Sequence, residues 1–297
     1  MPITNTIEKF KKYTTLLDEV FAANALTGVL ESDASVAQQG ANANEIIIPK
    51  LTMDGLGNYD RENGYPRGSV TLTTETKRFN YERGRMFIVD NMDNEESAGI
   101  AYGRLAGEFV RTRVVPEADA VRFAMIAGKS KAANRSVNAA YADGMAVYNA
   151  ITDALSAMAE KEVPMTDLHL FMTPTLYNLL QNMDSYRSKA MLDNFASTTR
   201  VPQTRFYSAV DLLTGADDET NRAGGYRKNE GAANLNWMIV HKPAILQFTK
   251  HASPKVVTPE QNQDMDAWKF GYRVYSLNDA YDNKLDGIWV DSDKALA

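Results

Sequence analysis

The sequence predicts an α+β fold organised around one long helix, and three observations support this prediction. Residues Glu95 to Gly128 carry apolar side chains at the spacing of a single helical face. Residues Glu45 to Asp90 contain two strand-like runs separated by a glycine-rich loop, and the last third of the chain contains two further strand-rich pieces. At 297 residues, the chain suits one large domain or two ordinary ones.

Composition and charge exclude several classes of function. The chain has no cysteine, which removes disulfides, thiolate nucleophiles and zinc–thiolate sites. The net charge is -6 and no basic run exceeds Lys11–Lys12, so we expect no sequence-specific binding to nucleic acid, although an acidic wall can still enclose it. The polar N-terminal stretch lacks a secretory signal, and charges interrupt every apolar run. We therefore expect a cytoplasmic protein that enters no membrane.

The N-terminal segment from Thr4 to Leu30 is predicted to be an amphipathic helix. Its apolar side chains, among them Phe10, Leu17 and Phe21, recur at intervals of three and four residues. The polar residues 31–45 that follow show no core face, which indicates a linker. Two interpretations stay open. The helix docks on its own domain, or it is an arm that contacts a neighbouring subunit.

The strands within Glu45 to Asp90 are predicted to form a two-stranded ribbon. Val70 and Leu72 alternate with polar residues, as in a half-buried strand. The glycines of the loop Asp54 to Ser69 indicate that it does not hold itself rigid, and a lone two-stranded ribbon is marginally stable in water. Either a sheet of the same chain or a neighbouring subunit must therefore cover it. The loop side chains expected to make such a contact are Leu56, Tyr59, Arg61, Tyr65 and Arg67.

The long helix is predicted to begin near Glu95, where the helix dipole favours an acidic side chain, and to end at Gly128. Pro116 removes one backbone donor from the middle of the helix, so we expect a kink or a break nearby. Charged residues one turn apart, such as Arg113 and Glu117, are expected to lie on a solvated face.

The region after the helix is predicted to be a compact α+β lobe. It contains a helical pattern from Met145 to Met158, a buried strand at Leu168–Met172, and a short helix that Thr173 caps. The stretch from Thr214 to Asn234 is too long and too polar for an ordinary connection, so it is either functional or disordered.

The sequence contains no pattern typical of a catalytic or ligand-binding site. The three histidines, His169, His241 and His251, are isolated, and neither a phosphate-binding glycine motif nor a GxSxG nucleophile occurs. The acidic residues between Asp279 and Asp286 lack the spacing of a calcium loop. We therefore expect no catalytic residue, no cofactor and no metal, and we predict that the protein is not an enzyme.

Four stretches of the chain carry a resemblance to a known family. They are FVRTRVVPEADAVRF (109–123), LHLFMTPTLYNLLQ (168–181), LNWMIVHKPAIL (235–246) and the closing run 268–290. In these stretches, and in the order of arm, long two-stranded loop, long helix, α+β lobe and closing strands, the chain resembles the major capsid protein of tailed bacteriophages. That family has the Hong Kong 97-type fold.

The resemblance implies four parts. These are an N-terminal arm (1–44), an E-loop and its base (45–90), a peripheral domain with the spine helix (91–130 and 242–277), and an axial domain (131–241 and 278–297). On the spine helix, Arg111, Arg113 and Glu117 become candidate assembly contacts.

The resemblance also implies a function and partners. The protein would self-assemble through pentamers and hexamers into an icosahedral shell, the virion capsid, in the bacterial host cytoplasm. The shell would enclose double-stranded DNA. A portal, and a separate scaffolding or decoration protein, are the further partners implied.

The sequence differs from the family pattern in two ways, and two alternative functions stay open. Only residues 1–44 precede the first strand, so scaffolding would come from a separate protein or be unnecessary. The loop Asp54 to Ser69 contains no lysine, so the covalent crosslink that some members form there is not expected. The alternatives are an encapsulin-like nanocompartment shell with the same fold, and a soluble α/β enzyme with a lid at Thr214 to Asn234.

Overall fold

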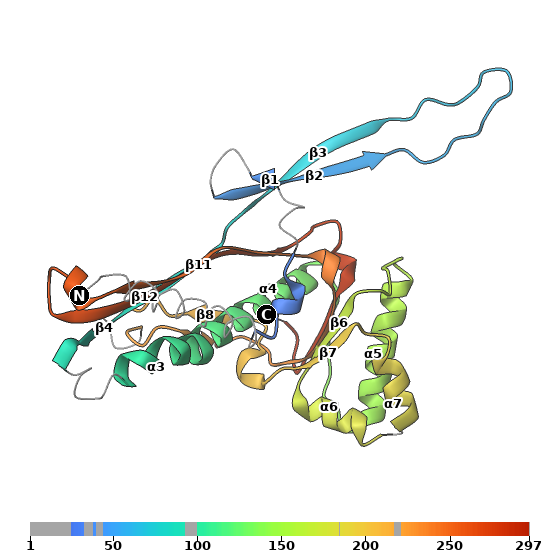
Figure 1. The fold of residues 1–297 in the computed structure, drawn as a ribbon. Coiled ribbons are helices and arrows are strands. Elements are labelled where there is room, and N and C mark those ends of the chain that lie inside the picture. The colour runs from blue at the N-terminus through green and yellow to red at the C-terminus, as the bar shows by residue number, and fades with distance from the viewer. Residues whose placement is uncertain are drawn as a thin grey trace.

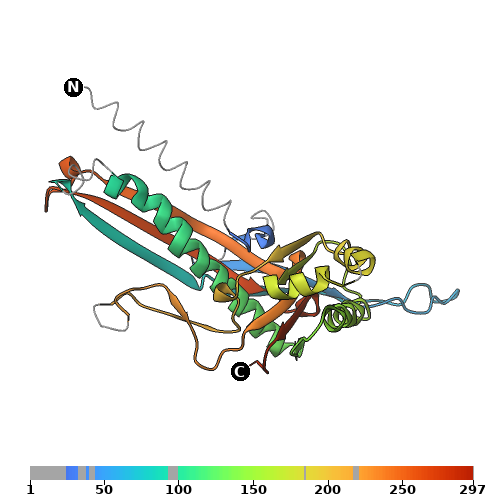
Figure 2. The same ribbon diagram turned by 90° about the horizontal axis from the view of Figure 1, so that it is seen from below.

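The computed structural model describes residues 25–32, 38–39, 44–92, 100–183, 185–216 and 221–296. Three parts are evident: a projecting hairpin, a long sheet lying along a helix, and a lobe of helices around a second sheet (Figure 1). A view from below shows the helix running along the length of the long sheet (Figure 2). The predicted α+β class is confirmed.

The projecting hairpin consists of β2 (Glu45–Met53) and β3 (Val70–Arg78), which pair antiparallel along their whole length. The short strand β1 (Gln38–Gln39) pairs with β2. The prediction of two strands with a long loop between them is confirmed. The loop, residues 54–69, points away from the rest of the molecule (Figure 1).

The long sheet has three antiparallel strands in the order β11-β12-β4. They are β11 (Ile245–Val257), β12 (Ala267–Ala280) and β4 (Tyr81–Asp90). The helix covers one face of this sheet because both present apolar side chains to the contact. The buried cluster between them contains Tyr81, Ala106, Val110, Val114, Val115, Phe270, Tyr272 and Val274.

The long helix is continuous, and a π-helical turn lies where the sequence predicts a kink or a break. It consists of α3 (Ile100–Phe109), a π-helical turn (Val110–Val114) and α4 (Val115–Ala132). Pro116 lies in the first turn of α4, and the wider π turn before it accommodates the missing backbone donor and the crowding by the proline ring.

The predicted end of the helix is wrong. Helix α4 continues through Gly128 to Ala132, and Asn134 follows with a φ of 56°, the left-handed conformation that commonly ends a helix. The backbone N–H of Arg135 then donates to the Ser130 carbonyl oxygen at 2.8 Å. Asparagine, rather than glycine, therefore ends this helix. Glu95 lies outside the described residues.

The lobe is built on a five-stranded sheet of order β5-β13-β10-β6-β7. Its strands are β5 (Ser136–Asn138), β13 (Ile288–Ser292), β10 (Leu235–His241), β6 (Leu168–Met172) and β7 (Ser197–Arg200). Its helices are α5 (Gly144–Ala159), α6 (Pro174–Gln181) and α7 (Ser185–Leu192). The predicted helices and strand are confirmed. Thr173 occupies the predicted N-cap position and Pro174 lies in the first turn, but the Thr173 side chain makes no capping hydrogen bond.

A small hairpin follows the lobe helices. It pairs β8 (Val210–Leu212) with β9 (Tyr226–Lys228), so part of the stretch predicted as an irregular loop, Thr214 to Asn234, is a strand. The Arg83 guanidinium donates to the carbonyl oxygens of Leu213 and Gly225 at 2.8 and 3.1 Å, which ties this hairpin to β4. Short 3-10 turns complete the chain at Gly28–Leu30, Gln203–Arg205, Lys242–Ala244, Pro259–Gln261 and Leu285–Gly287.

Residues 26–32 are fixed to the body by buried contacts, and we call them the N-terminal clasp. The Thr27 hydroxyl donates to the fully buried carboxylate of Asp119 at 2.7 Å and accepts from Arg122 at 2.9 Å. Leu30 is fully buried in the core beneath α4, and the Ser32 hydroxyl donates to the Ile245 carbonyl oxygen at 2.8 Å.

The N-terminal clasp corrects the interpretation of residues 4–30 as a separate arm. A segment that buries Leu30 and satisfies Asp119 is part of the core at its C-terminal end. The positions Phe10, Leu17 and Phe21 lie outside the described residues, so their expected role stays a prediction.

Candidate assembly surfaces

One face of the projecting hairpin is an exposed apolar patch. In the register of β2 and β3, Leu51 lies opposite Leu72 and Met53 lies opposite Val70, so the four side chains share one face. We call them the ribbon face. Their exposed fractions are 57%, 68%, 66% and 69%, in the order Leu51, Leu72, Met53 and Val70. The half-burial predicted for the second strand is therefore not achieved within the described part of the chain.

The base of the same hairpin is firmly attached. Lys77 lies 2.7 Å from Glu75 and 3.1 Å from Asp282, and Lys129 of α4 lies 2.6 Å from Asp279. Although burial opposes it, these neighbouring carboxylates raise the pKa of Lys77. Beside them lies an apolar cluster formed by Ile46, Ile48, Leu246, Phe248, Leu277 and Tyr281. The hairpin is thus held at its base while its far end is unsupported.

The tip of the loop forms a closed turn, which the sequence pattern did not predict. Asp60 and Gly64 exchange two backbone hydrogen bonds of 3.2 and 2.7 Å, and Gly64 has a φ of 80° that suits glycine. The Asp60 carboxylate accepts from the backbone N–H of Glu62 at 2.8 Å and from the Asn63 side chain at 2.7 Å. These bonds lower the pKa of Asp60.

Two aromatic rings flank this closed turn. The rings of Tyr59 and Tyr65 meet edge to face with their centroids 4.8 Å apart. We call residues 59–65 the tip knob. Its shape is set by contacts within the loop, so a partner is not needed to form it.

The predicted loop contacts all lie at the surface. Leu56 is fully exposed, and Tyr59 and Tyr65 are 58% and 86% exposed. Arg61 and Arg67 are also exposed, and neither forms an ion pair with another described residue. These five side chains are therefore accessible to a partner subunit.

The three predicted helix contacts differ in burial; they are Arg111, Arg113 and Glu117. Arg111 and Arg113 are exposed, but Glu117 is buried, so the prediction of a solvated face is wrong for it. The Glu117 carboxylate accepts from Arg83 at 2.6 Å and from the Tyr81 hydroxyl at 3.0 Å. Burial and the Glu117 charge raise the pKa of Tyr81. Arg83 was not predicted as a site residue, although the alternation of β4 places it on the face toward the helix.

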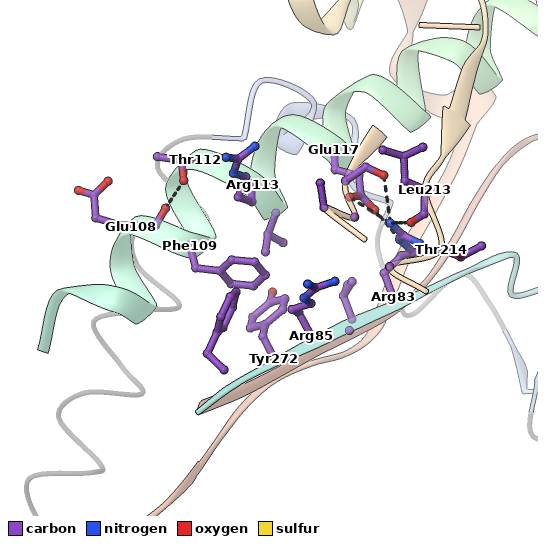
Figure 3. A pocket seen from close by; sticks show the side chains of 18 of the residues that line it. Arg83, Arg85, Glu108, Phe109, Thr112, Arg113, Glu117, Leu213, Thr214 and Tyr272 are labelled. Carbon is purple, nitrogen blue, oxygen red and sulfur yellow. Dashed lines mark hydrogen bonds and ion pairs between the residues drawn. The ribbon is translucent and has the colours of Figure 1, made fainter. Parts of the chain in front are cut away.

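A pocket of about 440 Å³ lies between the helix, the long sheet and the small hairpin (Figure 3). Its lining includes Arg83, Arg85 and Arg113 together with the aromatic rings of Phe109 and Tyr272. The pocket therefore combines cationic groups with apolar surface. The remaining lining residues include Phe87, Leu105, Glu108, Thr112, Val114, Glu117 and Leu213.

The lobe sheet buries titratable groups away from these surfaces. Asp291 is fully buried, and one carboxylate oxygen accepts from Asn236 at 2.6 Å while the other has no partner among the described residues. Burial raises the pKa of Asp291 to about 7. Burial lowers the pKa of His169 and of His241, so neither is poised to act as an acid at neutral pH.

We predict that Asp291→Asn stabilises the fold at pH 8 by up to about 4 kcal/mol. The pKa of Asp291 is about 7 in the folded chain and about 3.8 when unfolded, so its contribution to stability falls as pH rises from 3.8 to 7. Urea unfolding of both proteins between pH 4 and 8 tests this, because the histidine contributions cancel in the difference. Parallel stability curves for variant and parent would contradict it.

In the described ranges of the chain, no group of three or more His, Cys, Asp or Glu side chains is placed to hold a metal ion. No helix in those ranges has the length and apolar character needed to span a membrane. Comparisons of the sequence with models of protein families and with curated proteins find no match.

The structure is similar to solved capsid structures. A chain of Mycobacterium phage Che8 matches with a TM-score of 0.57 at 12% identity over 88% of this chain and 93% of its own. The mature capsid of bacteriophage PhiM1 matches with a TM-score of 0.58 at 12% identity over 91% and 87%. A virus-like particle from Pyrococcus furiosus matches with a TM-score of 0.56 at 10% identity over 94% and 97%. The chain therefore has the fold shared by these phage capsid and particle structures.

Proposed function

We propose that the protein is the major capsid protein of a tailed bacteriophage, a subunit that self-assembles into the icosahedral shell around the genome. The observation that carries this proposal is the length of the match: with the PhiM1 mature capsid it covers 91% of this chain and 87% of that chain. A match of that extent includes the hairpin, the long helix and the lobe together. The low identity of 12% limits the inference to the fold, so the function is inferred.

The exposed hairpin supports a role in assembly. A contiguous apolar patch on a projecting ribbon is typical of a protein–protein contact and not of an isolated subunit. The hairpin is also anchored at its base by the ion pairs of Lys77 with Asp279 and Asp282, which present the ribbon face in a defined direction. We therefore propose that residues 45–80, with the loop 54–69, lie on a neighbouring subunit.

The other parts take roles in the same proposal. Of residues 1–44, those that precede the N-terminal clasp supply an N-terminal arm. The long sheet and its helix form a peripheral domain (91–130 and 242–277), and strand β4 completes its sheet. The lobe (131–241 and 278–297) forms the axial domain around the centre of each pentamer or hexamer.

The partners follow from the same role. The main partner is the protein itself, and a portal and a separate scaffolding or decoration protein are further candidates. The shell would assemble in the host cytoplasm, become the virion capsid, and enclose double-stranded DNA without reading its sequence, which agrees with the net charge of -6.

One observation favours a second function on the same fold. The virus-like particle from Pyrococcus furiosus matches over 94% of this chain and 97% of its own. An encapsulin-like nanocompartment shell is therefore the alternative, less favoured because several other matches are phage capsids. Neighbouring genes for a portal and a terminase, or for an enzyme cargo, distinguish the two. The enzyme alternative has no match among the structures named here.

Assembly of the purified protein tests the proposal. Light scattering and electron microscopy across a range of salt and protein concentration should show closed shells or stable pentamers and hexamers. A protein that stays monomeric under all of these conditions would refute the proposal.

We predict that the assembled shell separates into single chains in hot denaturing detergent. The chain has no cysteine and the loop 54–69 has no lysine, so the two most accessible covalent links between subunits are absent. Gel electrophoresis of purified shells, without reducing agent, should show one band at the mass of the monomer. A ladder of linked oligomers would show that another side chain forms a covalent bond.

A further inference from the structure

The pocket between the helix and the long sheet has cationic groups that form no ion pair with the residues that the structure describes. Arg83 is paired with Glu117, but Arg113 forms no ion pair with a described residue, and Arg85 donates only to the Arg222 carbonyl oxygen at 3.1 Å. In Figure 3 the aromatic side chains of Phe109 and Tyr272 lie beside these arginines. Such a site suits a carboxylate carried next to an apolar or aromatic group.

The small hairpin shapes the pocket around Arg85. Gly215 has a φ of 74°, and a Cβ atom at this position would lie 2.7 Å from Arg85 Nη1. The positive φ favours glycine here, and a larger side chain would displace the end of the Arg85 side chain. On the opposite rim Glu108, Thr112 and Arg113 are exposed, so a ligand can reach this side of the pocket.

The tip knob has the complementary chemistry. Tyr59 and Tyr65 present two exposed rings, and Glu62 at the apex is an exposed carboxylate that forms no ion pair or side-chain hydrogen bond with a described residue. The Asp60 carboxylate is already used within the turn. Because these bonds preform the turn, the knob loses little conformational entropy when it enters a hollow.

We propose that the tip knob of one copy inserts into the arginine-lined pocket of a second copy. The Glu62 carboxylate then faces Arg85 and Arg113, and the two tyrosine rings pack on the aromatic wall. Arg61 lies near Glu108 on the rim, which also pairs with Arg111 at 2.7 Å. This inference rests on the proposed function, since it names the acceptor for the loop that a shell subunit extends to its neighbour.

The contact must join two copies. Within one chain, the tip of the β2–β3 hairpin points away from the sheet and helix that form the pocket (Figure 1). The anchored base of the hairpin opposes folding back, because the ion pairs of Lys77 and the apolar cluster around Ile46 would have to break.

A cysteine pair tests the contact directly, because the chain has no cysteine of its own. The full-length double variant Glu62→Cys, Thr112→Cys should assemble and, after mild oxidation, give linked oligomers on a non-reducing detergent gel. The matched control pairs Glu62→Cys with Lys161→Cys, an exposed position beyond α5 in the lobe, and should give single chains. Shells that form but link no better with the first pair than with the control would overturn the inference.

Charge reversal gives an independent readout. Glu62→Arg alone and Arg85→Glu alone should each raise the protein concentration needed for assembly about tenfold or more, and the two together should restore much of the loss. The control Lys161→Glu makes the same change of charge outside the pocket and should have no such effect. Single variants that assemble as the parent does, or a double variant that is no better than either, would count against the contact.

The two tests separate this inference from the proposed function. If the parent protein forms no shell or capsomer, the proposed function fails. If the parent assembles while the first cysteine pair stays unlinked, the function stands and the knob has another acceptor.

Discussion

A variant that lacks residues 1–30 is expected to lose most of its stability, whereas a variant that lacks residues 1–24 is expected to keep a cooperative thermal transition. The difference arises from the N-terminal clasp, whose hydrogen bonds to the body begin at Leu26. Loss of the buried Leu30 side chain costs about 2 to 5 kcal/mol, and the buried Asp119 carboxylate, left with Arg205 after losing its other donors, adds about 1 to 3 kcal/mol. Together these losses approach the whole stability of an ordinary domain.

Asp119 explains why the clasp matters so much. Its buried carboxylate accepts from the Leu26 and Thr27 backbone N–H groups at 3.2 and 3.1 Å and from the Thr27 hydroxyl at 2.7 Å. Arg205 lies 3.2 Å from it on the other side. Deletion of the clasp removes the first three donors and leaves the carboxylate with one arginine.

Point variants isolate the parts of this effect. Thr27→Val keeps the backbone donor but removes the hydroxyl between Asp119 and Arg122, and it should cost about 1 to 3 kcal/mol in urea unfolding. The matched control Thr52→Val, on the exposed hairpin, should change stability by less than about 0.5 kcal/mol. If the 1–30 deletion unfolds at the temperature of the parent, the segment is not part of the core.

The N-terminal clasp is also the clearest case of what sequence reasoning missed. Helical spacing and the polar run after Leu30 indicate an arm and a linker, and both signals are local. Thr27 bonds to Asp119, which lies 92 residues away in the sequence, and no local sequence pattern predicts such a pair. The same limit applies to Glu117, whose regular spacing from Arg113 indicates a surface pair although its partner is Arg83.

Features governed by backbone geometry were predictable. Pro116 cannot donate a backbone hydrogen bond wherever it lies, and a π-helical turn interrupts the α-helical pattern beside it. Alternating side chains in residues 70–78 indicate a strand, and its pairing with residues 45–53 is confirmed. The shape of the tip was not predictable from glycine content, because the Asp60 side chain and the two tyrosine rings hold the turn that the glycines allow.

Replacing the four side chains of the ribbon face with threonine is expected to abolish assembly without unfolding the subunit. The side chains are 57–69% exposed in the isolated chain, so the fold gains little from them. Covering all four in a subunit contact would stabilise each contact by roughly 4 to 8 kcal/mol, an upper limit that scales full burial by the exposed fraction. Threonine keeps the strand preference of the hairpin, so the effect reports on apolar contact and not on strand formation.

The control lies on the opposite face of the same strands. The double variant Thr52→Ala, Thr71→Ala changes two residues that lie directly opposite each other on that other face, and it should assemble as the parent does. Thermal unfolding checks that both variants are folded, and light scattering with electron microscopy then reports assembly. The large difference expected between the two faces follows from area alone, because the threonine pair offers far less apolar surface than two leucines, a methionine and a valine.

A ribbon-face variant that forms shells at the parent's concentration would show that the hairpin does not carry the contact. A variant that loses its thermal transition would show that the ribbon face belongs to the core of the subunit.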